Sequence, residues 1–197
     1  MGVSRMFAMR AKAALGGLAT GLCLAVAVGT AIADEEARRF GFGTPAGDAE
    51  IAKVDIDVMP DGRGAPPGEG SYQQGKEVYE AKCAACHGPD LQGVKEAGGA
   101  PLIGGRGTLD SDSPEKTVES YWPYASTLFD YTKRAMPFDA PGSLTDAEVY
   151  AVVAFILAEA NIVDRSAMMN AEALASIEMP NRNGFIPDSR PDVYDYR

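Results

Sequence analysis

The stretch YEAKCAACHGPD, residues 79–90, decides the fold because two of the three cysteines and the only histidine of the chain meet in it. Cys83 and Cys86 stand three residues apart, and His87 follows the second cysteine directly. This spacing is compatible with a metal site, a redox disulfide or a covalently attached cofactor. The rest of the 197-residue sequence must decide among them.

The N-terminus predicts export. Three basic residues precede an uncharged apolar run, residues 13–33, which ends in the cleavage pattern Ala31-Ile32-Ala33. We therefore expect a signal peptide over residues 1–33, cleavage after Ala33 and a mature protein in the periplasm. A retained membrane anchor is the alternative, although the run is rich in alanine and glycine rather than leucine and isoleucine.

The mature chain is strongly acidic. Removal of residues 1–33 leaves 15 Lys and Arg against 28 Asp and Glu, which is a net charge of −13. Nucleic acid and anionic membrane surfaces are poor partners for such a protein, whereas a basic protein surface is a good one. We expect protein partners, no nucleic acid, and a membrane only if the signal is kept as an anchor.

A haem fits the cysteine cluster better than the alternatives. Structural zinc needs four ligands, and the cluster offers three. A thioredoxin-type C-x-x-C follows a strand, whereas residues 70–82 favour a helix with Ser71 as its N-cap. Two thiols one helical turn apart can each bond a vinyl group of one porphyrin while the next imidazole faces the iron. We therefore predict one covalently bound haem c at Cys83, Cys86 and His87.

The second axial ligand of the iron cannot be histidine, because His87 is the only one. Methionine is the usual partner in cytochromes c. Met136 is the preferred candidate, since it lies in a Pro- and Gly-rich loop between two helical segments, and Met179 is the reserve. For the remaining methionines outside the signal we expect core packing; these are Met59, Met168 and Met169.

The chain divides into four parts by composition. A Gly- and Pro-rich arm over residues 34–71 follows the signal, a haem domain spans 72–162, and a tail without clear periodicity spans 163–197. The segment from Ser113 to Ala135 predicts two short helical pieces broken at Trp122-Pro123.

The clearest helix begins at Thr145, because Thr145 and Glu148 form a capping box. Residues 149–158 are all apolar, so this helix must be buried on more than one side. One side should pack on the haem domain. The other should be covered by the chain extensions or by a partner subunit.

Several other side chains are candidates for contact with the haem. Lys133 and Arg134 could pair with the propionates, although a solvated helix end explains them equally well. The same balance between haem contact and general core holds for the aromatic and aliphatic candidates; these are Trp122, Tyr124, Leu128, Phe129 and Phe138.

An iron held by His87 and Met136 has no open position and can only transfer electrons, so we expect no catalytic residues. An enzyme with a weakly held sixth ligand is the alternative, and a haem-based structural or sensing module is a third. No acid–base histidine is available to support the enzyme.

Residues 72–162 resemble class I cytochromes c. The resemblance implies an all-α fold in which the first and last helices cross, and it implies that Pro101 gives its backbone carbonyl to the ring N–H of His87. The matching features besides the C-x-x-C-H motif are Gly75, Tyr79, Pro101, Leu102, Met136 before a proline, and Phe155.

A narrower resemblance covers most of the mature chain. VDIDVMPDGRGAPPGEGS, YWPYASTLFDYTKRAMPF and MPNRNGF are similar to the cytochrome subunit of sulfane and sulfite dehydrogenases. This implies electron transfer from a molybdenum-cofactor subunit to a downstream cytochrome or oxidase. Some members carry two haems, whereas this chain has one C-x-x-C-H. A diffusible shuttle between a dehydrogenase and a terminal oxidase or photosynthetic reaction centre is the alternative.

Overall fold

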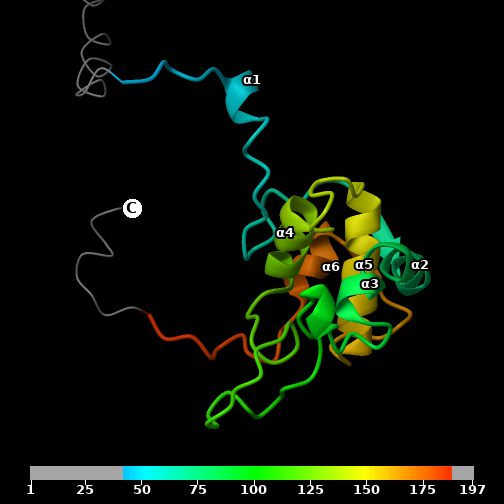
Figure 1. The fold of residues 1–197 in the computed structure, drawn as a ribbon. Helices are drawn as coiled ribbons and strands as arrows, with labels where there is room; N and C mark the ends of the chain where they lie inside the picture. Colours follow the sequence, from blue (N-terminus) through cyan, green and yellow to red (C-terminus); the bar gives the residue numbers. More distant parts are fainter. Residues whose placement is uncertain (1–41, 188–197) are drawn as a thin grey trace, which may run out of the picture. The chain divides into compact units, whose positions relative to one another are not determined.

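The computed structural model describes residues 42–187, of which residues 42–47 belong to an N-terminal unit and residues 48–187 to a second one. The second unit contains the helices and strands drawn in Figure 1. The predicted signal peptide lies outside the described residues. Within them, no helix is both long and apolar enough to cross a membrane.

Helix α2 (Tyr72–Lys82) begins where the sequence predicts. The Ser71 hydroxyl accepts the N–H of Gln74, and the Gln74 side chain accepts the N–H of Ser71, which completes a capping box. The helix buries Gly75 and Tyr79 and ends at Cys83.

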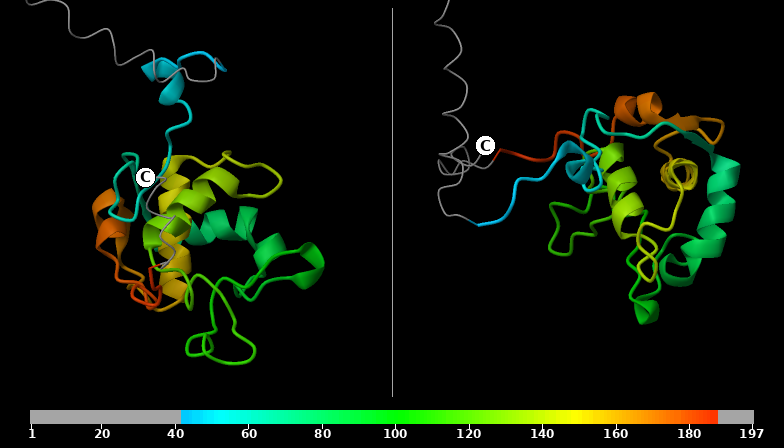
Figure 2. Two further views of the ribbon diagram at one scale, coloured as in Figure 1. Left: turned by 90° about the vertical axis from the view of Figure 1, so that its left-hand side faces the viewer. Right: turned by 90° about the horizontal axis from the view of Figure 1, so that it is seen from above.

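Helix α5 (Asp146–Glu159) is the centre of the fold. Thr145 and Glu148 form the predicted capping box, and every residue from 149 to 158 is buried. The view from above in Figure 2 looks along α5, with α2 and α4 (Ala125–Ala135) on opposite sides and α6 (Ala171–Ser176) on a third. The prediction of burial on more than one side is confirmed.

Helices α2 and α5 cross at a glycine. A Cβ atom at Gly75 would overlap the carbonyl group of Ala151 and would lie 2.9 Å from Phe155 Cβ, so only glycine fits. One turn later the ring of Tyr79 packs on Phe155 with 5.0 Å between centroids. The helix crossing implied by the family resemblance is confirmed.

The chain extensions cover the remaining side of α5. Strand β1 (Glu69–Ser71) ends the arm and pairs in antiparallel fashion with β2 (Met168–Asn170) of the tail, with Gly70 opposite Met169. Both strands contact α5. Three apolar side chains of the tail are fully buried in the core; these are Met169, Leu174 and Met179. The predicted covering of α5 was either the chain extensions or a partner subunit, and the structure shows the chain extensions.

Three expectations about side chains and helices are wrong. Met59 and Met168 are 44% and 46% exposed rather than packed in the core. Met168 precedes the buried Met169 in strand β2, where successive side chains point to opposite faces. Of the two helical pieces predicted around Trp122-Pro123, only α4 forms. The first piece is a turn, because hydroxyls of Thr117 and Ser120 bond to backbone groups there.

The other described elements are short. Helix α1 (Asp48–Ile51) lies in the arm, and α3 (Ala84–His87) carries the second half of the C-x-x-C-H motif. A single 3₁₀ turn, η2 (Lys95–Ala97), lies in the glycine-rich loop that follows the motif. The all-α fold with an N-terminal arm and a C-terminal tail is confirmed.

Candidate haem-binding site

The C-x-x-C-H motif forms one tight turn of helix. Cys83 ends α2 and begins α3, and its carbonyl oxygen accepts the N–H groups of Cys86 and His87 at 3.1 and 2.9 Å. Residues three and four apart on a helix share a face. Neither cysteine is in a disulfide; Cys83 is half-buried and Cys86 is exposed. Burial raises the pKa of the Cys83 thiol to about 11, so it is uncharged at neutral pH.

The His87 ring is held by the backbone of the following loop. Its Nδ1 lies 2.8 Å from the carbonyl oxygen of Ala100. A carbonyl can only accept, so Nδ1 carries the proton and Nε2 keeps its lone pair for a metal. The expectation that Pro101 supplies this carbonyl is wrong by one residue. Pro101 acts through its neighbour, because a proline restricts the preceding residue to extended geometry.

The glycine-rich loop packs against the motif itself. The carbonyl oxygens of Cys86 and His87 accept the N–H groups of Val94 and Gly93 at 2.9 and 2.8 Å. A Cβ atom at Gly99 would overlap the Cys86 carbonyl group, so a larger residue there would push the loop away. These contacts hold the Ala100 carbonyl beside the imidazole.

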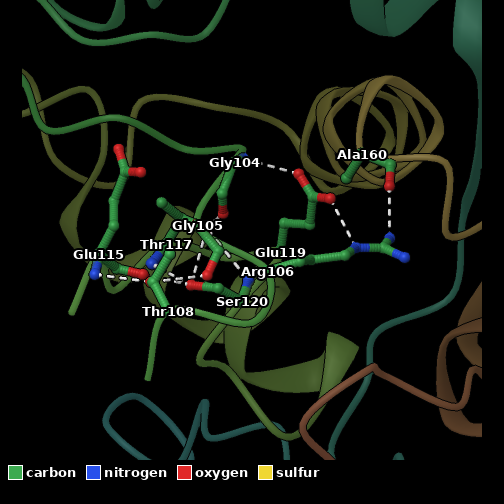
Figure 3. A network of polar contacts seen from close by, with 9 residues as sticks. All are labelled: Gly104, Gly105, Arg106, Thr108, Glu115, Thr117, Glu119, Ser120 and Ala160. Carbon is green, nitrogen blue, oxygen red and sulfur yellow. Dashed lines mark hydrogen bonds and ion pairs between the residues drawn. The ribbon is translucent and has the colours of Figure 1, made fainter. Parts of the chain in front are cut away.

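A polar network anchors the same loop further along (Figure 3). The carboxylate of Glu119 accepts the Gly104 N–H at 2.6 Å and pairs with Arg106 Nε at 2.5 Å. Arg106 also donates to the carbonyl oxygen of Ala160, just after α5, at 2.7 Å. Thr117 closes the network through a hydrogen bond to the Gly104 carbonyl. The sequence did not predict this network, because its hydrogen bonds join residues 13 to 54 positions apart.

Met136 belongs to a different element from the motif. It follows α4, its N–H donates to Thr132, and its side chain is half-buried next to a cis peptide bond to Pro137. The reserve candidate, Met179, is 1% exposed inside the apolar core. Its environment is that of a packing residue, so the structure favours Met136 between the two.

The predicted neighbours of the haem have different environments. Leu102 and Trp122 are half-buried against the apolar core, and Trp122 meets Tyr131 edge to face. The Tyr124 ring faces the Arg182 guanidinium at 4.8 Å, and Phe138 is 84% exposed. Of these four, only Leu102 and Trp122 lie against the core.

Leu128 and Phe129 are fully inside the core, and Phe129 packs on Tyr150. Of the two alternatives, haem contact and core packing, these residues therefore show core packing.

The basic residues before Met136 are engaged by the protein. Lys133 Nζ lies 2.7 Å from Asp146, and Arg134 pairs with Asp57 and Asp130. Both side chains therefore have carboxylate partners in the protein, and their contact with haem propionates stays a prediction. Asp57 lies in the arm and Asp146 begins α5, whereas Asp130 precedes Arg134 by four residues on α4 itself.

The residues of this site fit a haem c. Two thiols on one helical turn can bond two vinyl groups, and the imidazole beside them presents its unprotonated Nε2. Among residues 42–187, no group of three or more His, Cys, Asp and Glu side chains is placed to hold a metal ion.

Comparison with known proteins agrees with this geometry. The cytochrome c family model matches residues 72–159. The chain is 31% identical over 93 residues to the thiosulfate dehydrogenase of Stutzerimonas stutzeri strain A1501, which is 46% of this chain and 28% of that protein. It is 32% identical over 87 residues to the thiosulfate dehydrogenase of Allochromatium vinosum, which is 42% of this chain and 29% of that protein. The chain thus spans less than a third of either curated relative.

A solved structure matches a larger part of the chain. The crystal structure of the sulfane dehydrogenase SoxCD from Paracoccus pantotrophus contains a chain that is 38% identical, with a TM-score of 0.70. The match covers 80% of this chain and 76% of that one.

Proposed function

Since the chain belongs to the class I c-type cytochromes, we propose that it is a periplasmic electron-transfer protein with one covalently bound haem c. Cys83 and Cys86 would attach the haem, and His87 and Met136 would bind its iron. The observation that carries this proposal is the hydrogen bond from His87 to Ala100, because it leaves Nε2 free to bind iron on the residue that directly follows Cys86.

The chain's own residues account for a carrier. A haem c supplies an iron that takes up and releases one electron. The Ala100 carbonyl fixes the His87 ring and makes Nε2 a stronger donor. As an iron ligand, the thioether of Met136 would raise the reduction potential. With His87 and Met136 both bound to the iron, no ligand position would be left for a substrate.

The electron donor is the molybdenum-cofactor subunit of a dehydrogenase that oxidises sulfur compounds, and the acceptor is a downstream cytochrome or oxidase. The match to a chain of sulfane dehydrogenase supports this donor, since it covers 80% of this chain and so extends beyond residues 72–159. Parts of the arm or tail therefore belong to the shared structure. The net charge of −13 after signal removal favours a basic docking face on the partner.

Purification from the native periplasm at low ionic strength tests this proposal, because attraction between charged surfaces is screened by salt. We expect a particle heavier than the chain with about one molybdenum per haem. A molybdenum-free monomer under the same conditions would refute the fixed partnership and favour a diffusible shuttle. Repeating the measurement in high salt is the control, since an electrostatic complex should then dissociate.

A further inference from the structure

The hydroxyl of Tyr79 connects the helix crossing to the residue that follows His87. Tyr79 is 0% exposed, and its ring packs on Phe155 where α2 and α5 cross. Its hydroxyl donates to the carbonyl oxygen of Gly88 at 2.7 Å. Burial raises the pKa of this phenol above its ordinary value, so the hydroxyl stays protonated and donates.

Packing alone does not account for this hydroxyl. A phenylalanine would fill the same space against Phe155, whereas a buried hydroxyl needs a hydrogen-bond partner. The Gly88 carbonyl, for its part, otherwise accepts only the longer bond from the Leu91 N–H, at 3.3 Å, among the described residues. The Tyr79 bond is thus the shorter of the two that hold this peptide group.

Helix α3 needs support from outside. It is one turn long and ends at Gly88, whose φ of +77° departs from helical geometry. Its internal support consists of the bonds from Cys86, His87 and Gly88 back to the preceding turn. Such a short helix is not stable by itself.

We propose that Tyr79 is a positioning residue for His87, because its hydroxyl ties the end of α3 to the rigid crossing of α2 and α5. His87 is then held by Ala100 at its ring, by the Gly93 N–H at its own carbonyl and by Tyr79 at the next peptide group. This inference rests on the haem-binding part of the proposed function.

Tyr79→Phe tests the inference in the haem-loaded protein, with Tyr150→Phe as a matched control. Tyr150 is also 0% exposed, and its hydroxyl donates to the carbonyl oxygen of Pro66 at 2.8 Å, away from the motif. Each change removes one buried hydrogen bond, so the unfolding equilibrium constant of each should rise about fivefold. Only Tyr79→Phe should speed amide hydrogen exchange at His87 and Gly88, by about fivefold over the control. It alone should also raise the reduction potential, because a looser imidazole is a weaker donor to iron.

Equal exchange rates and potentials in the two variants would overturn the inference. Placing 4-aminophenylalanine at position 79 restores a donor at the same place and should return both readouts towards the unmodified protein. If Tyr79→Phe does not accumulate, the 4-aminophenylalanine protein decides the question. An amide exchange rate at Gly88 that differs from that of the unmodified protein would then refute the role of Tyr79. Failure of the proposed function is distinguishable, since the unmodified protein would then lack haem.

Discussion

Replacement of Gly75 by alanine should have two opposite effects on the free energy of unfolding, a gain in helix propensity and a loss of close packing. Gly75 lies inside α2, where alanine would favour the helix by about 1 kcal/mol. The new Cβ atom, however, would overlap the main-chain carbonyl of Ala151 and lie 2.9 Å from Phe155 Cβ. Carbon atoms pack best at about 3.5–4.0 Å, so the Phe155 contact alone forces the helices apart by about 0.6 Å.

The steric effect should exceed the propensity gain. Overpacking costs about 1–3 kcal/mol, and the upper end applies because a main chain cannot rotate away. Separation also weakens the pairing of Phe155 with Tyr79 and Tyr72, at centroid distances of 5.0 and 5.3 Å. Each such pair contributes about 0.5–1.5 kcal/mol. After subtraction of the propensity gain, Gly75→Ala should lose about 2–4 kcal/mol.

Chemical denaturation of the haem-loaded protein measures this loss. Gln73→Ala is the control, since Gln73 is an exposed position of the same helix and should change stability by less than about 0.5 kcal/mol. The double change Gly75→Ala with Ala151→Gly should not recover stability, because the obstructing atoms are main chain. A Gly75→Ala protein as stable as the unmodified one would refute the close crossing.

Three further predictions concern acid stability, ligation and the loop. The hydrogen bond from Lys82 lowers the pKa of Glu148 to about 2, so its contribution to stability is complete above its ordinary pKa of 4.5 and is lost as pH falls towards 2; Glu148→Gln should flatten acid denaturation in that window. Met136→Ala should bind added imidazole, seen by absorbance, whereas Met179→Ala should lose about 2–5 kcal/mol of stability and bind none. Glu119→Gln should lose about 1.5–3 kcal/mol and speed proteolysis of residues 105–115; stability within error of the unmodified protein would contradict this.

Local signals in the sequence predicted the helices and the motif well. Ser71 and Thr145 mark helix starts through their own side chains, and an apolar run from 149 to 158 has no other place than the core. The C-x-x-C-H turn is equally local, because the backbone bonds that close it, from Cys86, His87 and Gly88, each span three or four residues. For these features the physical cause and the sequence signal are the same residues.

Long-range contacts could not be predicted in this way. The pairing of Gly70 with Met169 joins residues about a hundred positions apart through strands of three residues each, which leave no periodic pattern. Arg134 pairs with Asp57 of the arm, and nothing in its own neighbourhood distinguishes this distant carboxylate from a propionate. Its second partner, Asp130, lies four residues earlier on α4 and is a local pair.

The carbonyl that meets His87 illustrates a different limit. Backbone acceptors have no side-chain signature, so Ala100 could be found only through the effect of Pro101 on the residue before it. The family resemblance implied the carbonyl of Pro101, so the predicted acceptor was one residue too late.

The intact mass of the protein purified from the periplasm and analysed under denaturing conditions tests the haem assignment. We predict a single species in which the chain from Asp34 onwards retains one haem through Cys83 and Cys86. Because thioether bonds survive unfolding, a mass equal to the bare polypeptide, or a haem lost on denaturation, would contradict the assignment.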